Sequence, residues 1–112
     1  DTGGDAGWDL SGIDLSEYDR VRVELESTTW ENIGLRLCDS THNNWHGFNT
    51  QVEPNVFDVY LSGQGASWVS DNGTDFDKTQ GLKIIIQTWD RTKEEKTVVK
   101  SIELLRGQRT VN

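Results

Sequence analysis

The stretch Arg20-Val21-Arg22-Val23-Glu24-Leu25-Glu26 alternates polar and apolar residues at every position. A period of two is typical of a β-strand that buries one face and exposes the other. Further stretches alternate in the same way or are rich in β-branched residues: residues 33–38, 44–49, 56–61, 81–89 and 97–104. Turn residues separate these stretches, and no helical apolar period is sustained anywhere. The sequence therefore predicts about six to eight short strands in an antiparallel sandwich or barrel, with residues 1–7 as a leading loop.

The size and charge of the chain limit what it can be. At 112 residues it is predicted to form a single domain spanning residues 1–112. Its formal net charge of −8 disfavours nucleic acid and anionic membranes, because phosphate groups are bound by clusters of Lys and Arg. No apolar run reaches the roughly 18–20 residues of a membrane span. Cys38 is the only cysteine, so no internal disulfide is expected, and a neutral partner fits best.

Five tryptophans are an unusual share of the aromatic residues in a chain with three Phe, two Tyr and no Met. An indole is large, flat and rigid and carries an N–H donor, so it serves either as a core residue or as a stacking surface. Trp8 is expected to close one end of the core. Trp45 and Trp89 are expected to contact a ligand, because their neighbours in the strand alternation are polar. Trp30 and Trp68 stay open between the two roles, and both are kept as ligand-binding candidates.

Strand alternation also divides each predicted strand between a core face and an open face. The core face is expected to hold Ile33, Leu35, Leu37, Phe48, Leu82, Ile84 and Ile86. The open face is expected to bring together Arg36, Trp45, Asn49, Gln87 and Trp89, with Gly34 and Cys38 beside them. Flat indoles bordered by amide and guanidinium groups are typical of sugar binding. A pyranose ring stacks its C–H face on an indole, while its hydroxyls pair with polar side chains.

The order of these segments resembles a known family of domains. Gly7-Trp8-Asp9-Leu10 and residues 14–19 lead into the strand at residues 21–24, and residues 33–39 are followed by a return strand that bears Trp45. Thr74-Asp75-Phe76-Asp77-Lys78 then precedes the strand at residues 82–89, and residues 98–104 form a last strand. This pattern is similar to that of the carbohydrate-binding modules of β-jelly-roll type attached to bacterial enzymes that degrade plant polysaccharides. One departure is that no separate strand is expected before Trp8.

The resemblance implies a jelly-roll β-sandwich whose concave sheet forms a ligand groove. Carried to the matching positions, it implies that Arg36, Trp45 and Gln87 touch the ligand, with Trp89 near the rim. It also implies a neutral plant polysaccharide as partner, a β-glucan or a related hemicellulose, and a tethered glycoside hydrolase outside the cell. The domain itself is expected to be non-catalytic. One alternative is a structural accessory domain that packs on a neighbouring catalytic domain through its exposed tryptophans. The other is a small jelly-roll enzyme, which is least favoured because no catalytic constellation is found.

Two segments are candidates for a metal site. Asp71, Asp75 and Asp77 alternate around a glycine in a loop, a spacing that can supply oxygen ligands to calcium but also makes ordinary turns. A structural calcium therefore stays an alternative, and no other cofactor is expected. His42 and His46 are four apart, the spacing of zinc ligands on a helix, but in a turn and strand that spacing separates them by about 13 Å.

No catalytic constellation stands out in the sequence. Glycoside hydrolysis needs two carboxyl groups that face each other across a cleft. Glu24 and Glu26 share one face of a predicted strand, and Glu94 and Glu95 lie in a Lys-rich loop, so both pairs are interpreted as solvated surface. No motif of a serine nucleophile or a phosphate-binding loop is present.

Overall fold

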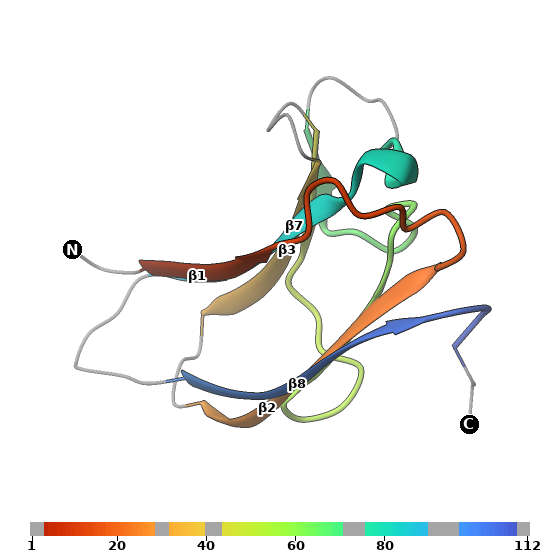
Figure 1. The fold of residues 1–112 in the computed structure, drawn as a ribbon. Helices are drawn as coiled ribbons and strands as arrows, with labels where there is room; N and C mark the ends of the chain where they lie inside the picture. Colours follow the sequence, from red (N-terminus) through yellow and green to blue (C-terminus); the bar gives the residue numbers. More distant parts are fainter. Residues whose placement is uncertain (1–3, 29–31, 40–43, 71–75, 90–96, 110–112) are drawn as a thin grey trace.

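The computed structural model describes residues 4–28, 32–39, 44–70, 76–89 and 97–109, and it is all-β (Figure 1). The described residues form eight strands and one short 3-10 helix: β1 (Gly4–Asp9), β2 (Arg20–Thr28), β3 (Ile33–Asp39), β4 (Trp45–Phe48), β5 (Val56–Tyr60), β6 (Trp68–Val69), η1 (Lys78–Gln80), β7 (Leu82–Thr88) and β8 (Thr97–Leu105). The strands make two sheets, a larger one in the order β1-β7-β3-β4-β6 and a smaller one in the order β5-β2-β8. Every pairing is antiparallel. The prediction of an all-β chain with antiparallel strands is confirmed.

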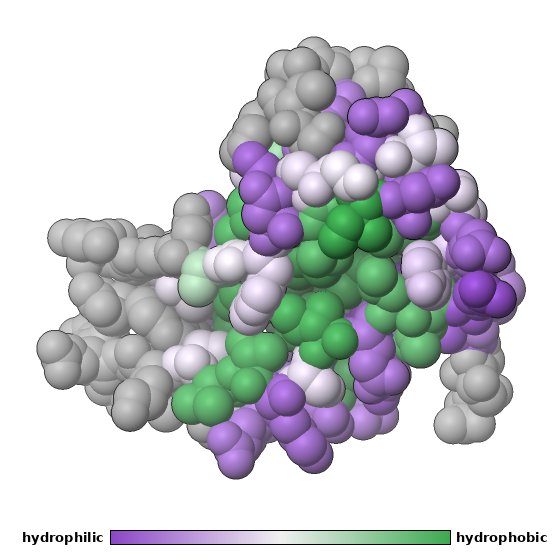
Figure 2. All heavy atoms as spheres, viewed as in Figure 1, coloured by the Kyte–Doolittle hydropathy of each residue, from purple (hydrophilic) through white to green (hydrophobic). Residues whose placement is uncertain are grey.

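The two sheets contribute to one hydrophobic core. Its buried members in the strands are Val21, Val23, Leu25, Ile33, Leu35, Leu37, Phe48, Phe57, Val59, Leu82, Ile84 and Ile86. These are alternate residues of β2, β3, β5 and β7, as the period of two requires, together with Phe48 at the end of β4. Every residue that the sequence assigned to the core face is among them, so that part of the prediction is confirmed. Figure 2 shows one end of this core, with hydrophobic atoms in the centre of the view and hydrophilic ones around them.

The first strand was not predicted. Residues 4–7 were assigned to a leading loop, but β1 (Gly4–Asp9) pairs along β7 at the edge of the larger sheet. Gly7 lies opposite Ile85, and a Cβ atom at Gly7 would come within 2.6 Å of the Ile84 carbonyl oxygen. A glycine therefore allows β1 to approach β7 closely, which residue propensity alone does not reveal. Trp8 of this strand packs against the core, which confirms its structural role.

Contacts between Asp39 and Asn44 help to set the register of the strands that carry the candidate site. The backbone N–H of Asp39 donates to the Asn44 carbonyl at 3.0 Å, and the Asn44 side-chain amide donates to the Asp39 carboxylate at 2.6 Å. The chain then returns along β3, with Trp45 opposite Cys38 and Gly47 opposite Arg36. Because the side-chain period is two, this register puts Arg36, Trp45 and Gly47 on the face away from the core.

Candidate functional site

A continuous row of residues crosses the outer face of the larger sheet. The paired positions run from Gly7 on β1 through Ile85 on β7, Arg36 on β3 and Gly47 on β4 to Trp68 on β6. Glycine at two of these five positions leaves space above the backbone. Side chains from the other positions can therefore lie flat across the sheet.

Arg36 is the centre of this face, and it is only 5% exposed. Its Nε donates to Oε1 of Gln87 at 3.0 Å, and its Nη1 donates to Oδ1 of Asn49 at 2.7 Å. A guanidinium group is planar and rigid, so these two bonds fix its plane and the orientation of both amides. Since each amide turns its oxygen toward Arg36, each NH₂ group points away and is available to donate to a ligand.

Two tryptophans flank the Arg36 guanidinium. The Cζ atom of Arg36 lies 5.3 Å from the ring centroid of Trp68 and 5.4 Å from that of Trp89. Both distances are within the range of cation–π attraction, which is strongest for indoles. The buried cation therefore holds two aromatic rings in fixed positions on the same face. Trp68 belongs to the edge strand β6 and is 42% exposed.

Two glycines make room for this arrangement. A Cβ atom at Gly47 would overlap the indole of Trp68, and one at Gly34 would overlap the guanidinium of Arg36. Neither glycine has a positive φ, so their role here is to leave space rather than to allow a turn. Sequence reasoning alone assigned these two glycines no function. The available signal was a glycine at the centre of two neighbouring strands that otherwise alternate regularly.

A hollow of about 290 Å³ lies on this face, lined by Arg36, Trp45, Trp68, Ile85 and Gln87. Its walls combine flat aromatic and aliphatic surface with a cation and an amide. Ligand sites are usually of this kind, mostly apolar with a few polar groups in fixed positions. The arrangement can stack on an apolar face of a ligand and donate hydrogen bonds to its polar groups.

The structure brings most of the sequence-predicted site residues together. Arg36, Trp45, Trp68 and Gln87 line the hollow, while Asn49 and Trp89 contact Arg36 directly. Trp30 lies outside the described residues.

Arg36 and Cys38 lie on the face away from the core, as expected, but neither is exposed there. Arg36 is covered by Trp68, which comes from the unpredicted strand β6, and Cys38 is fully buried. The cross-strand neighbours of Cys38 are Trp45 and Lys83, and its thiol donates to the Asp39 carbonyl at 3.3 Å.

The candidate metal ligands do not converge in the part of the chain that the structure describes. Asp71 and Asp75 lie outside it, and Asp77 caps η1, with its Oδ1 accepting from the backbone N–H of Thr79 at 3.1 Å and from the Thr79 hydroxyl at 2.6 Å. His42 also lies outside, and His46 stacks on Phe76 with ring centroids 4.2 Å apart. Among the described residues, no group of three or more His, Cys, Asp or Glu side chains is placed to hold a metal ion.

Of the four glutamates considered for hydrolysis, the two that the structure describes do not face each other across a cleft. Glu24 lies on the smaller sheet, with a carboxylate oxygen 3.7 Å from Nζ of Lys100. Glu26 is exposed at the surface, and Glu94 and Glu95 lie outside the described residues. The interpretation of Glu24 and Glu26 as surface residues agrees with these positions.

Comparison of the chain with protein-family models, with curated proteins and with solved structures finds no match. Within the described ranges, no helix is both long and apolar enough to span a membrane. The chemistry of the face around Arg36 is therefore the basis on which a function can be inferred.

Proposed function

We propose that this chain is a non-catalytic domain that binds a neutral plant polysaccharide, a soluble β-glucan or a related hemicellulose, on the outer face of its larger sheet. The observation that carries the proposal is the Arg36 cluster, in which one buried guanidinium orients two amides and holds two indoles. The indoles offer stacking surfaces to the C–H faces of pyranose rings. The amides of Asn49 and Gln87 offer N–H donors to the sugar hydroxyls.

The fold proposed for this function is a β-sandwich of jelly-roll type. Support comes from the shared core, to which both antiparallel sheets contribute their inward-facing residues. In this fold the outer face of the larger sheet is the concave one, and the hollow beside Arg36 is part of a groove for a polysaccharide chain. A groove binds a single soluble chain rather than a flat crystalline surface.

The proposed setting is outside the cell, with the domain tethered to a glycoside hydrolase. Tethering raises the effective concentration of the catalytic domain at its substrate without any catalytic group in the binding domain. The net charge of −8 supports a neutral partner, since a polyanion would be repelled by the chain as a whole.

A second candidate is a structural accessory domain that packs on a neighbouring catalytic domain. The observation in its favour is the edge strand β6, where Trp68 is 42% and Val69 is 52% exposed. Exposed apolar side chains at a sheet edge suit a protein interface as well as a sugar. In this case the Arg36 cluster would stiffen the interface instead of contacting a polysaccharide.

Affinity electrophoresis distinguishes the two candidates. The wild-type chain is expected to migrate more slowly in gels that contain β-glucan or xyloglucan than in gels without polysaccharide, with xylan and mannan as comparison gels. Trp45→Ala, Trp68→Ala and Trp89→Ala should each weaken the apparent affinity at least about tenfold, because each removes an indole that lines the hollow or lies against Arg36.

Trp8→Phe is the matched control, because Trp8 packs against the core and not on the outer face. This variant should be retarded as strongly as the wild type. Absence of retardation in all four polysaccharides would contradict the proposed function and favour the accessory domain. Retardation that survives all three alanine substitutions would place the binding site elsewhere.

A further inference from the structure

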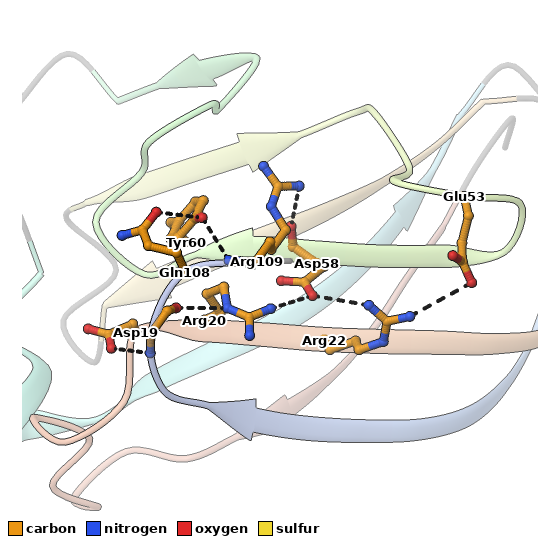
Figure 3. A network of polar contacts seen from close by, with 9 residues as sticks. Asp19, Arg20, Arg22, Glu53, Asp58, Tyr60, Gln108 and Arg109 are labelled. Atoms are coloured by element: carbon orange, nitrogen blue, oxygen red, sulfur yellow. Dashed lines mark hydrogen bonds and ion pairs between the residues drawn. The ribbon is translucent and has the colours of Figure 1, made fainter. Parts of the chain in front are cut away.

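A second hollow, of about 500 Å³, lies on the outer face of the smaller sheet, on the other side of the core from Arg36. It is lined by Arg20, Arg22, Val52, Glu53, Asp58, Leu105 and Arg109. Figure 3 shows how the side chains of β2, β5 and the C-terminal segment meet there. These residues belong to a different sheet from the proposed polysaccharide site and were not singled out by the sequence analysis.

The C-terminal segment forms one wall of this hollow and is anchored to β5. Nη1 of Arg109 donates to the Asp58 carbonyl at 3.1 Å, and the Arg109 backbone N–H donates to the Tyr60 hydroxyl, also at 3.1 Å. The Tyr60 hydroxyl in turn donates to Oε1 of Gln108 at 2.9 Å. The N–H donated by Arg109 also lowers the pKa of Tyr60 below its ordinary value of 10.0. This wall is therefore held in place by the strand it covers.

Asp58 forms the floor of the hollow and is only 3% exposed. Its Oδ2 accepts from Nη1 of Arg20 at 2.6 Å and from Nη1 of Arg22 at 3.1 Å. Its Oδ1 is also buried, but it accepts no hydrogen bond from any described residue. A buried carboxylate oxygen without a donor is costly, so a donor that reaches this oxygen would be favoured.

The charges around the hollow indicate what kind of ligand it accepts. The lining holds three guanidinium groups, those of Arg20, Arg22 and Arg109, and the carboxylates of Asp58 and Glu53, so the lining itself carries one net positive charge. Arg20 and Arg22 pair with these carboxylates, whereas Arg109 bonds to the Asp58 carbonyl. Glu103 of β8 lies opposite Arg22 on the same sheet but is not part of the lining. Glu53 is at the rim, with its side chain 62% exposed and 3.7 Å from Arg22. A local positive charge in a chain of net charge −8 favours a ligand with a single negative charge.

We propose that this hollow is a second binding site, which takes a hydroxylated carboxylate of the chemical class of the uronic acids. The ligand carboxylate would pair with Arg22 and Arg109, and a neighbouring hydroxyl would donate to the Asp58 carboxylate in the place that Arg22 leaves. Arg22 is the side chain that moves, because it is 32% exposed whereas Arg20 is 11% exposed. Arg20 stays on Asp58 while Arg22 turns to the ligand. This site does not depend on the function proposed for the larger sheet.

Isothermal titration calorimetry with sodium glucuronate tests the proposal. The wild-type chain should bind with a Kd on the order of 1 mM, as expected for a few charge-assisted hydrogen bonds at a solvent-accessible site. Arg22→Gln and Arg109→Gln should each weaken binding at least about tenfold, since each removes a charged donor. Arg106→Gln is the matched control, because it makes the same charge change at an exposed arginine that does not line the hollow, and it should leave Kd unchanged.

Two further probes separate the parts of the recognition. Glucose lacks the carboxylate and acetate lacks the hydroxyls, so both should bind at least about tenfold more weakly than glucuronate. Tighter binding of a glucuronate-bearing xylan oligosaccharide would identify a polymer unit as the source of the ligand, and equal or weaker binding would identify the free acid. The proposal is overturned if glucuronate does not bind, if acetate binds equally well, or if Arg106→Gln weakens binding as much as the other two variants. Melting curves of each variant show whether the fold is kept.

Discussion

An Arg36→Met variant is expected to bind soluble β-glucan at least about a hundredfold more weakly than the wild-type chain while keeping both sheets. Methionine is apolar and long enough to occupy the buried position, but it cannot donate a hydrogen bond. Asn49 and Gln87 would lose the donor that orients them, and Trp68 and Trp89 would lose the cation between them. The two amides and the two indoles would therefore lose their fixed orientation together.

Arg36→Lys is the more informative comparison, because it keeps the positive charge but replaces the planar guanidinium group with an ammonium group. A lysine ammonium cannot hold both amides in the same plane, so we expect a loss of at least about tenfold, smaller than that for methionine. Arg106→Met should change nothing, since Arg106 contacts Glu17 and Tyr18 instead. Calorimetry gives the affinities, and far-ultraviolet circular dichroism checks the fold. Wild-type affinity in Arg36→Met would contradict the central role assigned to this residue.

A Phe57→Ala variant is expected to lower the free energy of unfolding by about 3–5 kcal/mol. Phe57 is fully buried on β5, opposite Val23 on β2, and belongs to the core shared by the two sheets. Its removal leaves a cavity that a packed interior closes only in part. The free energy of unfolding of a small domain is only about 5–15 kcal/mol, so this single change would remove a large part of it.

Urea denaturation of the wild type and the variant measures this loss. Val52→Ala is the control, because Val52 is 42% exposed and its truncation should cost less than about 0.5 kcal/mol. A Phe57→Ala loss no larger than that of Val52→Ala would mean that the two sheets do not depend on a common core.

The strands with regular alternation could be predicted from the sequence, and so could the face on which each residue lies. Phe48 is buried in the core, and Arg36, Asn49 and Gln87 meet on the opposite face. Alternation determines the face of a residue because successive side chains of a strand point to opposite sides. Once one residue of a strand is assigned to the core, its neighbours follow.

The two edge strands of the larger sheet, β1 and β6, could not be predicted in the same way. β1 is rich in glycine and aspartate, and β6 has only two residues, so neither gives a periodic signal. Both form because a neighbouring strand offers an unpaired edge, which is a tertiary effect. The burial of Arg36 under Trp68 depends on this edge strand and on the absence of a side chain at Gly47. For this reason the sequence predicted an exposed arginine where the structure has a buried one.

The second hollow was missed for a related reason. Arg20, Arg22 and Asp58 follow the alternation of β2 and β5 and would be solvated on an open sheet. The C-terminal segment also folds back onto β5, where Arg109 bonds to the Asp58 carbonyl and the Tyr60 hydroxyl. Local sequence does not show which strand a terminal segment covers. The two outer faces of the molecule therefore carry different chemistry, one aromatic and the other built of paired arginines and carboxylates.

The central claim, that the outer face of the larger sheet binds polysaccharide, is tested most directly by NMR titration of the ¹⁵N-labelled chain with a β-glucan hexasaccharide. The indole N–H signals of Trp45, Trp68 and Trp89 and the Nε–H signal of Arg36 are expected to shift together along a single saturating curve. The indole signal of Trp8, which packs against the core, should stay in place. Saturating shifts confined to other residues, or no shifts at all for β-glucan, xyloglucan, xylan and mannan oligosaccharides, would contradict the claim.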